Sequence, residues 1–240
     1  MRHVASFSGG KDSTAMVLRL IEEGRPIDEI VFFDTGWEFP QMYDHIAKFE
    51  AFTGRTVTRL THRQPFGDEM LNRNPVAGSN RVWVGWPSMH RRWCTQIKMR
   101  TIRRHVQGDM QYVGIASDES ARLSTGYLSA KHNIFPLVEW DMDEAACLAY
   151  CRARGFDWGG LYDRFPRVSC YCCPLQRIGQ LRNLRRHFPA LWAQMLVWDT
   201  EIGAHNRGFK GYDKVADLER RFAQEDRQGE LPGMANSAIG

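Results

Sequence analysis

The 240-residue sequence contains no apolar run as long as a membrane span. It also lacks internal repeats and low-complexity tracts, and its N-terminus leads straight into a short apolar segment instead of a signal peptide. These absences argue against a membrane-spanning protein and a repeat array, and they predict a cytoplasmic protein with no membrane partner. The composition, with 43% hydrophobic and 25% charged residues, is that of a globular protein with a sizeable core.

Acidic residues are missing from two long stretches, although the net charge is only +4. Residues 73–104 contain eight Lys or Arg and no Asp or Glu, and residues 164–186 contain six and no acid. Such stretches predict an anionic ligand, either a phosphorylated small molecule or nucleic acid, and the alternative is a solvated basic face. Trp83, Trp86 and Trp93 lie within the first stretch, where they would either stack on bases or pack under a loop.

The six cysteines are not expected to form structural disulfides, because the cytoplasm keeps thiols reduced. Cys147 and Cys151 are four residues apart in a helical pattern and are predicted to lie in the core. The other four are Cys94 and the closely spaced Cys170, Cys172 and Cys173. The latter three are followed by a proline, as in many iron-sulfur sites.

This pattern predicts a 4Fe-4S cluster with Cys94, Cys170 and Cys173 as ligands. Cys172 is either the fourth ligand or a free thiol that leaves one iron open. Zinc held by four thiolates is the alternative metal, and plain reduced thiols are the remaining possibility.

Strand and helix patterns alternate along the chain. Strands are predicted at residues 4–7, 30–33, 56–60 and 111–115, and helices at 12–22, 39–52, 94–106 and 141–154. This order predicts an α/β fold, a Rossmann-like doubly wound parallel sheet whose ligands bind at the carboxyl ends of the strands. Residues 72–92 are predicted to form a long functional loop and residues 174–205 a helix-rich segment. Residues 229–240 carry no periodicity and are expected to fray.

Two domains are predicted. Residues 1–140 would form the nucleotide-binding α/β domain, and residues 141–240 a helical segment that carries the cysteine run and packs on the first domain. Asp141 and Glu144 have the spacing of a capping box at the start of the segment's first helix.

The first strand leads into Ser8-Gly9-Gly10-Lys11-Asp12-Ser13, directly before a helical stretch. Glycines allow a tight turn, the N–H groups of a first helical turn attract anions, and the lysine adds a full positive charge. The spacing differs from that of the P-loop of kinases and GTPases. It resembles the PP-loop of the ATP pyrophosphatases, also called adenine nucleotide alpha hydrolases, and the alternative is an ordinary glycine-rich turn.

Further motifs follow in order: Asp34-Thr35-Gly36 after the second strand, Cys94 with Lys98, Gly114-Ile115 with Asp118, Glu119, Ser120 and Arg122, and Pro136-Leu137 with Trp140. With the loop, they resemble the phosphoadenosine phosphosulfate (PAPS) reductase family over about residues 2–190. The resemblance implies an adenine nucleotide, ATP with Mg²⁺, bound by Ser6, Ser8, Gly9, Gly10, Lys11, Asp12, Ser13, Asp34, Thr35 and Gly36. The remaining polar residues predicted to bind substrate or anions are Arg91, Arg92, Lys98, Asp118, Glu119 and Arg122.

The sequence departs from the reductases of this family at two places. The resemblance implies a nucleophilic cysteine on a C-terminal tail, and no cysteine follows Cys173. The adjacent cysteine pair that binds the cluster in the iron-sulfur reductases is reduced to Cys94 at the matching position. Relatives that modify DNA by phosphorothioation, or that thiolate tRNA, combine the same loop with a cluster.

The leading hypothesis is therefore ATP-dependent adenylation of a substrate, with release of pyrophosphate, coupled to cluster-assisted sulfur transfer onto an acceptor such as nucleic acid. Lys11 and Asp12 are its expected catalytic residues, and the sulfur would come from a donor such as a cysteine desulfurase or from free sulfide. The alternative is sulfonucleotide reduction of PAPS or adenylyl sulfate, in which Cys172 or a partner's thiol replaces the missing nucleophile. A further alternative is a nucleotide-binding or redox-sensing module without turnover.

Overall fold

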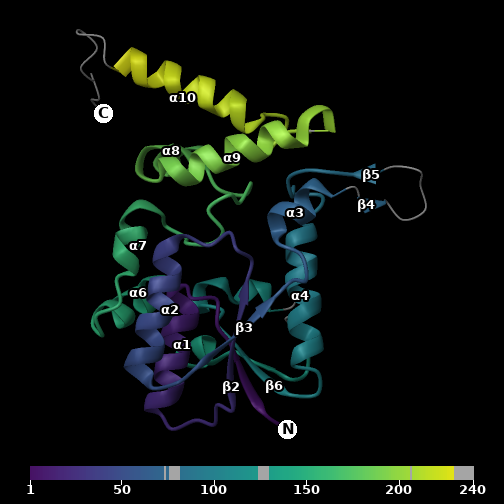
Figure 1. The fold of residues 1–240 in the computed structure, drawn as a ribbon. Coiled ribbons are helices and arrows are strands. Elements are labelled where there is room, and N and C mark those ends of the chain that lie inside the picture. The colour runs from purple at the N-terminus through teal and green to yellow at the C-terminus, as the bar shows by residue number, and fades with distance from the viewer. Residues whose placement is uncertain (73, 76–81, 124–129, 206, 230–240) are drawn as a thin grey trace. The chain divides into compact units, whose positions relative to one another are not determined.

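The computed structural model describes residues 1–72, 74–75, 82–123, 130–205 and 207–229 (Figure 1). By its internal contacts the chain divides into two compact units. The first unit comprises residues 1–66 and 94–171, and the second comprises residues 67–93 and 172–240. These boundaries differ from the division at residue 140 predicted from the sequence.

The first unit is built on a five-stranded sheet. Its strands are β1 (His3–Ser6), β2 (Glu29–Asp34), β3 (Val57–Thr61), β6 (Met110–Val113) and β7 (Asn133–Ile134), in the order β3-β2-β1-β6-β7. Each neighbouring pair is parallel, with Ser6 opposite Val31 on one side and Val113 on the other. The predicted parallel α/β fold is thus confirmed.

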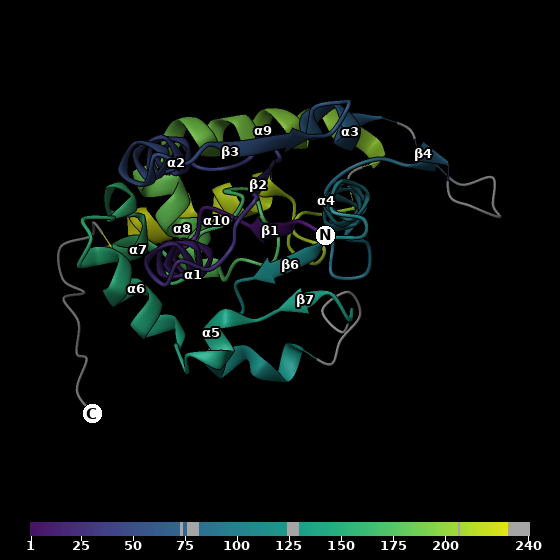
Figure 2. The ribbon, with the colours of Figure 1, turned by 90° about the horizontal axis from the view of Figure 1, so that it is seen from below.

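Helices cover both faces of this sheet. The two helices α1 (Lys11–Glu22) and α2 (Pro40–Thr53) lie on one face and α4 (Trp93–His105) on the other (Figure 2). The shorter helices of the unit are η1 (Ser117–Arg122), α5 (Pro136–Glu139), α6 (Glu144–Arg152), η3 (Trp158–Gly160) and α7 (Leu161–Arg164). Buried apolar residues such as Val4, Ile30 and Phe49 form the core between the layers.

Helix α6 begins two residues later than the capping-box spacing predicts. Asp143 is its N-cap, and the Asp143 carboxylate accepts a hydrogen bond from the Ala146 N–H at 2.7 Å. Asp141 has a φ of +52°, which is not helical. The helix packs on α1 through fully buried Cys147 and Cys151, so these cysteines lie in the core as predicted. This packing places α6 in the first unit.

The second unit contains α3 (Phe66–Leu71) except for its first residue, the short strands β4 (Asn74–Pro75) and β5 (Val82–Trp83), α8 (Ile178–His187), α9 (Pro189–Ile202), η4 (Gly203–His205) and α10 (Val215–Gly229). Trp86 is 3% exposed, packs edge-on against Trp198 and Phe209, and donates a hydrogen bond from its ring nitrogen to Asp199 at 3.1 Å. For this tryptophan the packing alternative is confirmed. The side chain of Trp83 and the predicted fraying of residues 229–240 lie outside the described residues.

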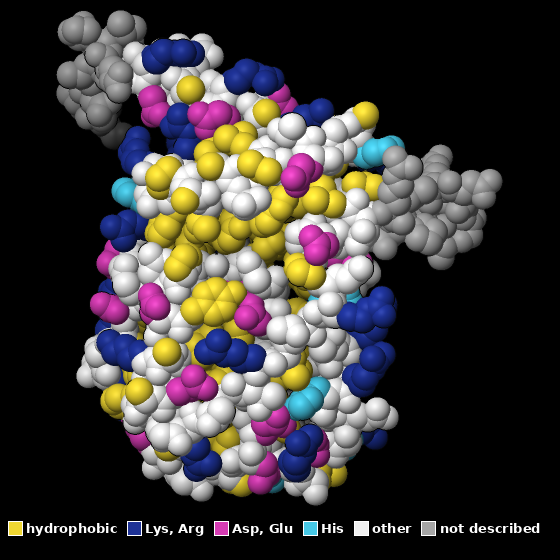
Figure 3. All heavy atoms as spheres, viewed as in Figure 1, with side chains coloured by type: hydrophobic (Ala, Val, Ile, Leu, Met, Phe, Trp, Pro, Cys, Tyr) yellow, Lys and Arg dark blue, Asp and Glu magenta, His cyan; other side chains and the backbone are white. Residues whose placement is uncertain are grey.

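The second basic stretch is opposed by acids of α10, a helix that the sequence analysis did not predict. Arg182 pairs with Glu225 at 2.6 Å, and Arg185 pairs with Glu219 at 2.8 Å and with Asp226 at 2.5 Å. Figure 3 shows basic and acidic side chains close together on the part of the surface that this helix forms. The acid-free stretch 164–186 is therefore opposed, at Arg182 and Arg185, by acids from a distant part of the chain.

Across the described ranges, every helix is too short or too polar to cross a membrane.

Candidate nucleotide-binding site

The site is built where β1 ends and α1 begins. Four residues separate Ser6, the last strand residue, from Lys11, the first helical residue. Gly9 has a φ of +74°, and a Cβ atom there would lie 2.9 Å from the Met42 side chain. Only glycine fits this turn without strain, because a side chain disfavours the left-handed region and would collide with α2.

Two serines close the loop onto the first helical turn. The Ser13 hydroxyl donates to the Gly10 carbonyl at 3.1 Å and accepts a hydrogen bond from the Ser8 N–H at 3.1 Å. The two hydroxyls lie 3.0 Å apart. Ser6 accepts a hydrogen bond from the Gln111 amide of β6, so its hydroxyl links neighbouring strands. These predicted nucleotide-binding serines shape the loop from within.

Lys11 stands between two carboxylates although its side chain is buried. Its ammonium Nζ donates to Glu144 at 2.6 Å and to Asp12 at 3.0 Å. Burial lowers the pKa of Lys11, but the hydrogen bond to Glu144 and the charge of Asp12 outweigh it, and the net pKa is raised. Burial also raises the pKa of Asp12, against the charge of Lys11 and with smaller contributions from Glu144 and Glu119. Positive and negative charge are concentrated beside the loop.

Aromatic residues of η3 and α7 hold the loop from outside. The Trp158 ring nitrogen donates to the Gly9 carbonyl at 2.7 Å, and the Tyr162 hydroxyl accepts the Lys11 backbone N–H at 2.8 Å. The Lys11 N–H belongs to the first helical turn and is one of the donors expected to face an anion. In this structure the tyrosine hydroxyl accepts the hydrogen bond from that N–H group.

A buried histidine supports the same tryptophan. The His45 ring stacks on Trp158 with 4.4 Å between centroids, and its Nε2 lies 2.9 Å from the Thr14 hydroxyl. Burial lowers the pKa of His45 to about 3, so the ring is neutral at physiological pH.

The second predicted motif lies after β2. Asp34 accepts a hydrogen bond from the Gly36 N–H and one from the Tyr43 hydroxyl, each at 2.8 Å. Thr35 donates to Glu38 through its hydroxyl at 2.7 Å. Burial raises the pKa of Glu38, and Thr35 and the charge of Lys98 lower it by smaller amounts. Because the sheet is parallel, this carboxylate group and the glycine loop lie at the same edge.

Cys170 is brought to this strand end. Its Sγ lies 3.6 Å from the Thr35 hydroxyl and 4.0 Å from Glu38 Oε1, and the next residue, Tyr171, donates its N–H to the Trp37 carbonyl at 2.8 Å. The sequence predicted Cys170 as a metal ligand and gave no sign of these neighbours.

The predicted cluster ligands are divided between the two units. Cys94 and Cys170 belong to the first unit, and Cys172 and Cys173 belong to the second. Cys172 is completely buried, and the other three are partly exposed. Among the described residues, no group of three or more His, Cys, Asp or Glu is placed to hold a metal ion.

The residues predicted to bind substrate or anions also lie on different elements of the chain. Glu119 and Arg122 pair with each other at 2.7 Å in η1, and Asp118 is exposed on the same helix. Gly114, at the end of β6, brings this segment against α1, because a Cβ there would lie 3.1 Å from the Ser13 backbone. Lys98 is on α4.

Arg91 and Arg92 belong to the second unit. The Arg91 N–H donates to the Ser88 carbonyl in a turn, and burial lowers the Arg91 pKa. Arg92 lines a cavity of that unit.

Sequence reasoning missed the long-range partners of the loop. Glu144 was interpreted only as a capping residue, and Tyr43, Glu38, Trp158 and Tyr162 were not identified. Local patterns carry no signal for these contacts. The adjacent Gly159-Gly160, with φ values of +58° and +77°, form the turn next to Trp158.

Comparison with known proteins agrees with this geometry. Residues 2–176 match the phosphoadenosine phosphosulfate reductase domain. The chain belongs to this family. The match spans the loop, the Asp34–Gly36 segment, η1 and the cysteine run, in the order that the sequence analysis identified.

Individual relatives of the family differ in length. An uncharacterized protein of Methanocaldococcus jannaschii is 27% identical over 204 residues, covering 79% of this chain and 39% of the relative. Another from the same organism is 25% identical, with 46% of its length covered, so the chain spans less than half of these two relatives. The adenosine 5'-phosphosulfate reductase of Geobacillus kaustophilus is 30% identical, covering 79% of this chain and 78% of the reductase.

Among solved structures, the U34-tRNA thiolase NcsA from Methanococcus maripaludis with its [4Fe-4S] cluster aligns over all of this chain and 84% of that chain, with a TM-score of 0.46 and 14% identity.

Proposed function

We propose that this family member binds ATP at the loop between β1 and α1 and transfers the adenylyl group to an acceptor, with release of pyrophosphate. The observation that carries the proposal is the buried Lys11 ammonium, at 2.6 Å from Glu144 and 3.0 Å from Asp12, at the N-terminus of α1. A buried cation held between two carboxylates beside a helix N-terminus offers one site for phosphate oxygens and another for a divalent cation.

In the proposed reaction an acceptor oxygen attacks the α-phosphorus of ATP. The bond from the α-phosphorus to the bridging oxygen breaks, and pyrophosphate leaves with the electron pair. Lys11 neutralises the developing charge on the leaving group, and the N–H groups of the loop orient it. The serine hydrogen bonds keep the loop in the required shape before ATP arrives, which lowers the cost of ordering it.

The carboxylates fit a magnesium ion by donor chemistry. Mg²⁺ is usually held by one or two protein carboxylates together with substrate phosphates, and Asp12 and Glu144 supply two. The ion, when bound with ATP, would neutralise phosphate charge. Lys11 would then exchange its carboxylate partners for phosphate oxygens.

Sulfur transfer is the second half of the proposal. An adenylated oxygen is a good leaving group, so free sulfide can attack the activated atom, form the new bond to sulfur and displace AMP, which leaves with the electron pair. A persulfide from a cysteine desulfurase would displace AMP in the same way, and a thiol reductant would then have to cleave the resulting disulfide. The chain belongs to a family whose domain is named for the reduction of a phosphosulfate, and this membership supports a reaction that involves sulfur. No step of the proposal passes through a metal cluster.

Metal analysis on protein purified without oxygen tests the cluster prediction separately. The sequence pattern predicts about four iron and four sulfide per chain. Iron and zinc at trace amounts only would refute both the cluster prediction and its zinc alternative. Loss of iron in Cys94→Ser, Cys170→Ser and Cys173→Ser, with retention in Cys147→Ser, would support the predicted ligand set, and retention of iron in Cys94→Ser would contradict it.

The function is tested by following the nucleotide products. With α-labelled ATP, Mg²⁺, sulfide and a pool of RNA and DNA, we expect AMP and pyrophosphate, and ATP binding that weakens at least tenfold in Lys11→Ala. Lys131→Ala, which removes an exposed lysine of the same unit, is the matched control. Formation of ADP, or equal binding by Lys11→Ala, would refute the proposal.

A second candidate is reduction of a sulfonucleotide, because the Geobacillus relative, 30% identical, is named as an adenosine 5'-phosphosulfate reductase. In that reaction a thiolate attacks the sulfur, AMP leaves, and a second thiol releases sulfite and leaves a disulfide. Cys172, the candidate nucleophile, is completely buried. Sulfite formation from adenylyl sulfate and dithiothreitol, without any requirement for ATP, would favour this reaction over adenylation.

A further inference from the structure

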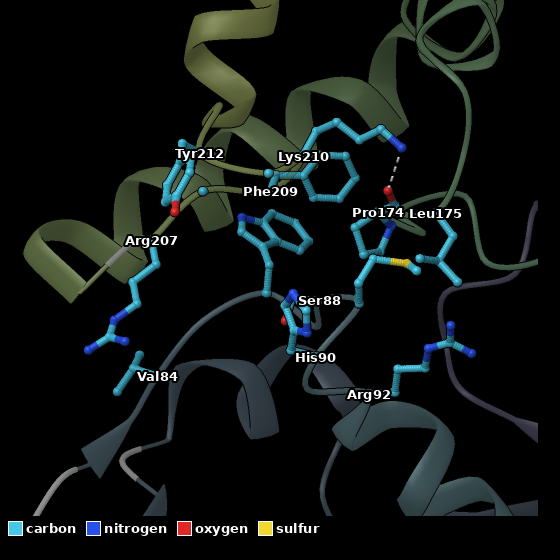
Figure 4. A pocket seen from close by; sticks show the side chains of 14 residues that line it. Val84, Ser88, His90, Arg92, Pro174, Leu175, Arg207, Phe209, Lys210 and Tyr212 are labelled. Carbon is cyan, nitrogen blue, oxygen red and sulfur yellow. Dashed lines mark hydrogen bonds between the residues drawn. The ribbon is translucent and has the colours of Figure 1, made fainter.

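The second unit contains a cavity of about 860 Å³ that no step of the proposed reaction uses. It lies between residues 84–92 and residues 207–212, and Pro174 and Leu175 close one side (Figure 4). Buried Trp86 and Phe209 line it with aromatic surface. Its size is within the range of about 300–1,000 Å³ that is usual for ligand sites.

The basic side chains that line the cavity are Arg92, Arg207, Lys210 and His90, and no Asp or Glu is among the described lining residues. The Lys210 ammonium donates to the Pro174 carbonyl at 2.9 Å and to the Gln176 carbonyl at 2.6 Å, so it also fixes the wall. In Figure 4, Arg207 and Arg92 lie at opposite sides of the cavity with His90 between them. This spread of exposed basic groups suits an extended polyanion better than a single phosphate.

An exposed aromatic ring stands beside these groups. Tyr212 is 97% exposed, so its side chain contributes nothing to the core. It is presented by a tight turn in which the Phe209 N–H donates to the Asp213 carbonyl at 2.7 Å. At Gly208, where φ is +104°, a Cβ atom would lie 2.7 Å from the Gly211 carbonyl oxygen. The Tyr212 ring is thus exposed to solvent at a turn whose conformation requires glycine at position 208. An exposed ring in a fixed position is suited to stacking on a flat ligand.

We propose that this cavity binds single-stranded nucleic acid, with phosphates along Arg92, His90 and Arg207 and a base stacked on Tyr212. A single strand is required because a base inside a duplex is already stacked and cannot lie on the tyrosine. The proposal names the substrate class of the acceptor and in that sense rests on the proposed adenylation, but strand binding itself does not depend on it.

Fluorescence anisotropy of the full chain with labelled 12-nucleotide single-stranded RNA and DNA tests the proposal. We expect binding that weakens with added salt, and a loss of about tenfold in Tyr212→Ala and in Arg207→Ala. Tyr212→Phe keeps the ring and should bind as the wild type does. Arg220→Ala removes an exposed arginine of the same unit that does not line the cavity, and it should change affinity less than twofold.

The outcomes separate this proposal from the previous one. No binding to either strand, equal binding by Tyr212→Ala and Arg207→Ala, equal affinity for duplex, or equal competition by a mononucleotide would each overturn it. Lys11→Ala should bind the strand normally while losing AMP formation. If the wild type binds the strand and forms no AMP from ATP, the adenylation fails and the nucleic-acid site stands.

Discussion

At the scale of single residues, the glycine loop between β1 and α1 is supported by side chains that are distant from it in the sequence. His45 stacks on Trp158, whose ring nitrogen holds the Gly9 carbonyl. The histidine is therefore a buried support for the loop, and its neutral form is the one that fits.

Protonation of His45 should destabilise the protein. The unfolded chain binds a proton on this ring near its ordinary pKa of 6.5, whereas the folded state does so near 3. Stability from the neutral ring is therefore complete above pH 6.5 and is lost as the pH falls toward 3. Between pH 7 and pH 5 the expected loss is about 2 kcal/mol.

Urea unfolding of the wild type and of His45→Gln, which cannot titrate, measures this loss. The variant should lose about 2 kcal/mol less than the wild type between the two pH values. An identical pH dependence in both proteins would show that the His45 pKa is not lowered.

The Tyr162 hydroxyl accepts a hydrogen bond from the backbone N–H of Lys11. An anion bound in the loop would use the same N–H group as a donor. Tyr162→Phe removes this competitor, and a neutral hydrogen bond contributes about 1 kcal/mol, so ATP should bind about fivefold more tightly. Isothermal titration calorimetry measures the change. Tyr150→Phe, which removes a hydroxyl bonded to Glu22, is the control, and weaker binding by Tyr162→Phe would instead assign the hydroxyl a role in shaping the site.

At the scale of elements, the approach of β6 to α1 sets the geometry of the site. Gly114 lies where an added Cβ would be 3.1 Å from the backbone of Ser13. Backbone atoms cannot rotate away as a flexible side chain can, so the helix and strand would have to separate.

Gly114→Ala should therefore reduce the free energy of unfolding by about 1–3 kcal/mol. Gly179→Ala is a matched control, because nothing lies within 4 Å of a Cβ at that position in α8, and helix propensity should make it neutral or stabilising by up to about 1 kcal/mol. Chemical denaturation compares the two variants, and equal stabilities would mean that the strand and helix are not closely packed at Gly114.

At the scale of the whole molecule, the two units interleave in sequence. Residues 67–93 group with residues 172–240, and Trp86 with Asp199 is one of the contacts that join these segments. Helix α6 and the segment with Trp158 belong to the α/β unit, beyond the predicted boundary at residue 140.

A fragment of residues 1–140 should consequently fail to fold. It lacks Glu144, which pairs with buried Lys11, and Cys147 and Cys151, which are fully buried against α1. An unpaired buried ammonium and an uncovered apolar helix face are both costly. Circular dichroism should detect no cooperative thermal transition in the fragment, whereas the full chain should have one. A cooperative transition in the fragment would instead support the boundary at residue 140.

The sequence by itself determined the α/β class, the glycine loop, the motifs of the family and the burial of Cys147 and Cys151. These features depend on local chemistry: alternating apolar patterns, glycine in a left-handed turn, and thiols on an apolar helix face. Only the tertiary structure decided that Glu144 and Tyr162 contact Lys11, that Trp158 binds the Gly9 carbonyl, and that acids of α10 pair with the arginines of α8. These are contacts between residues far apart in the chain, and local patterns do not specify which distant side chains meet.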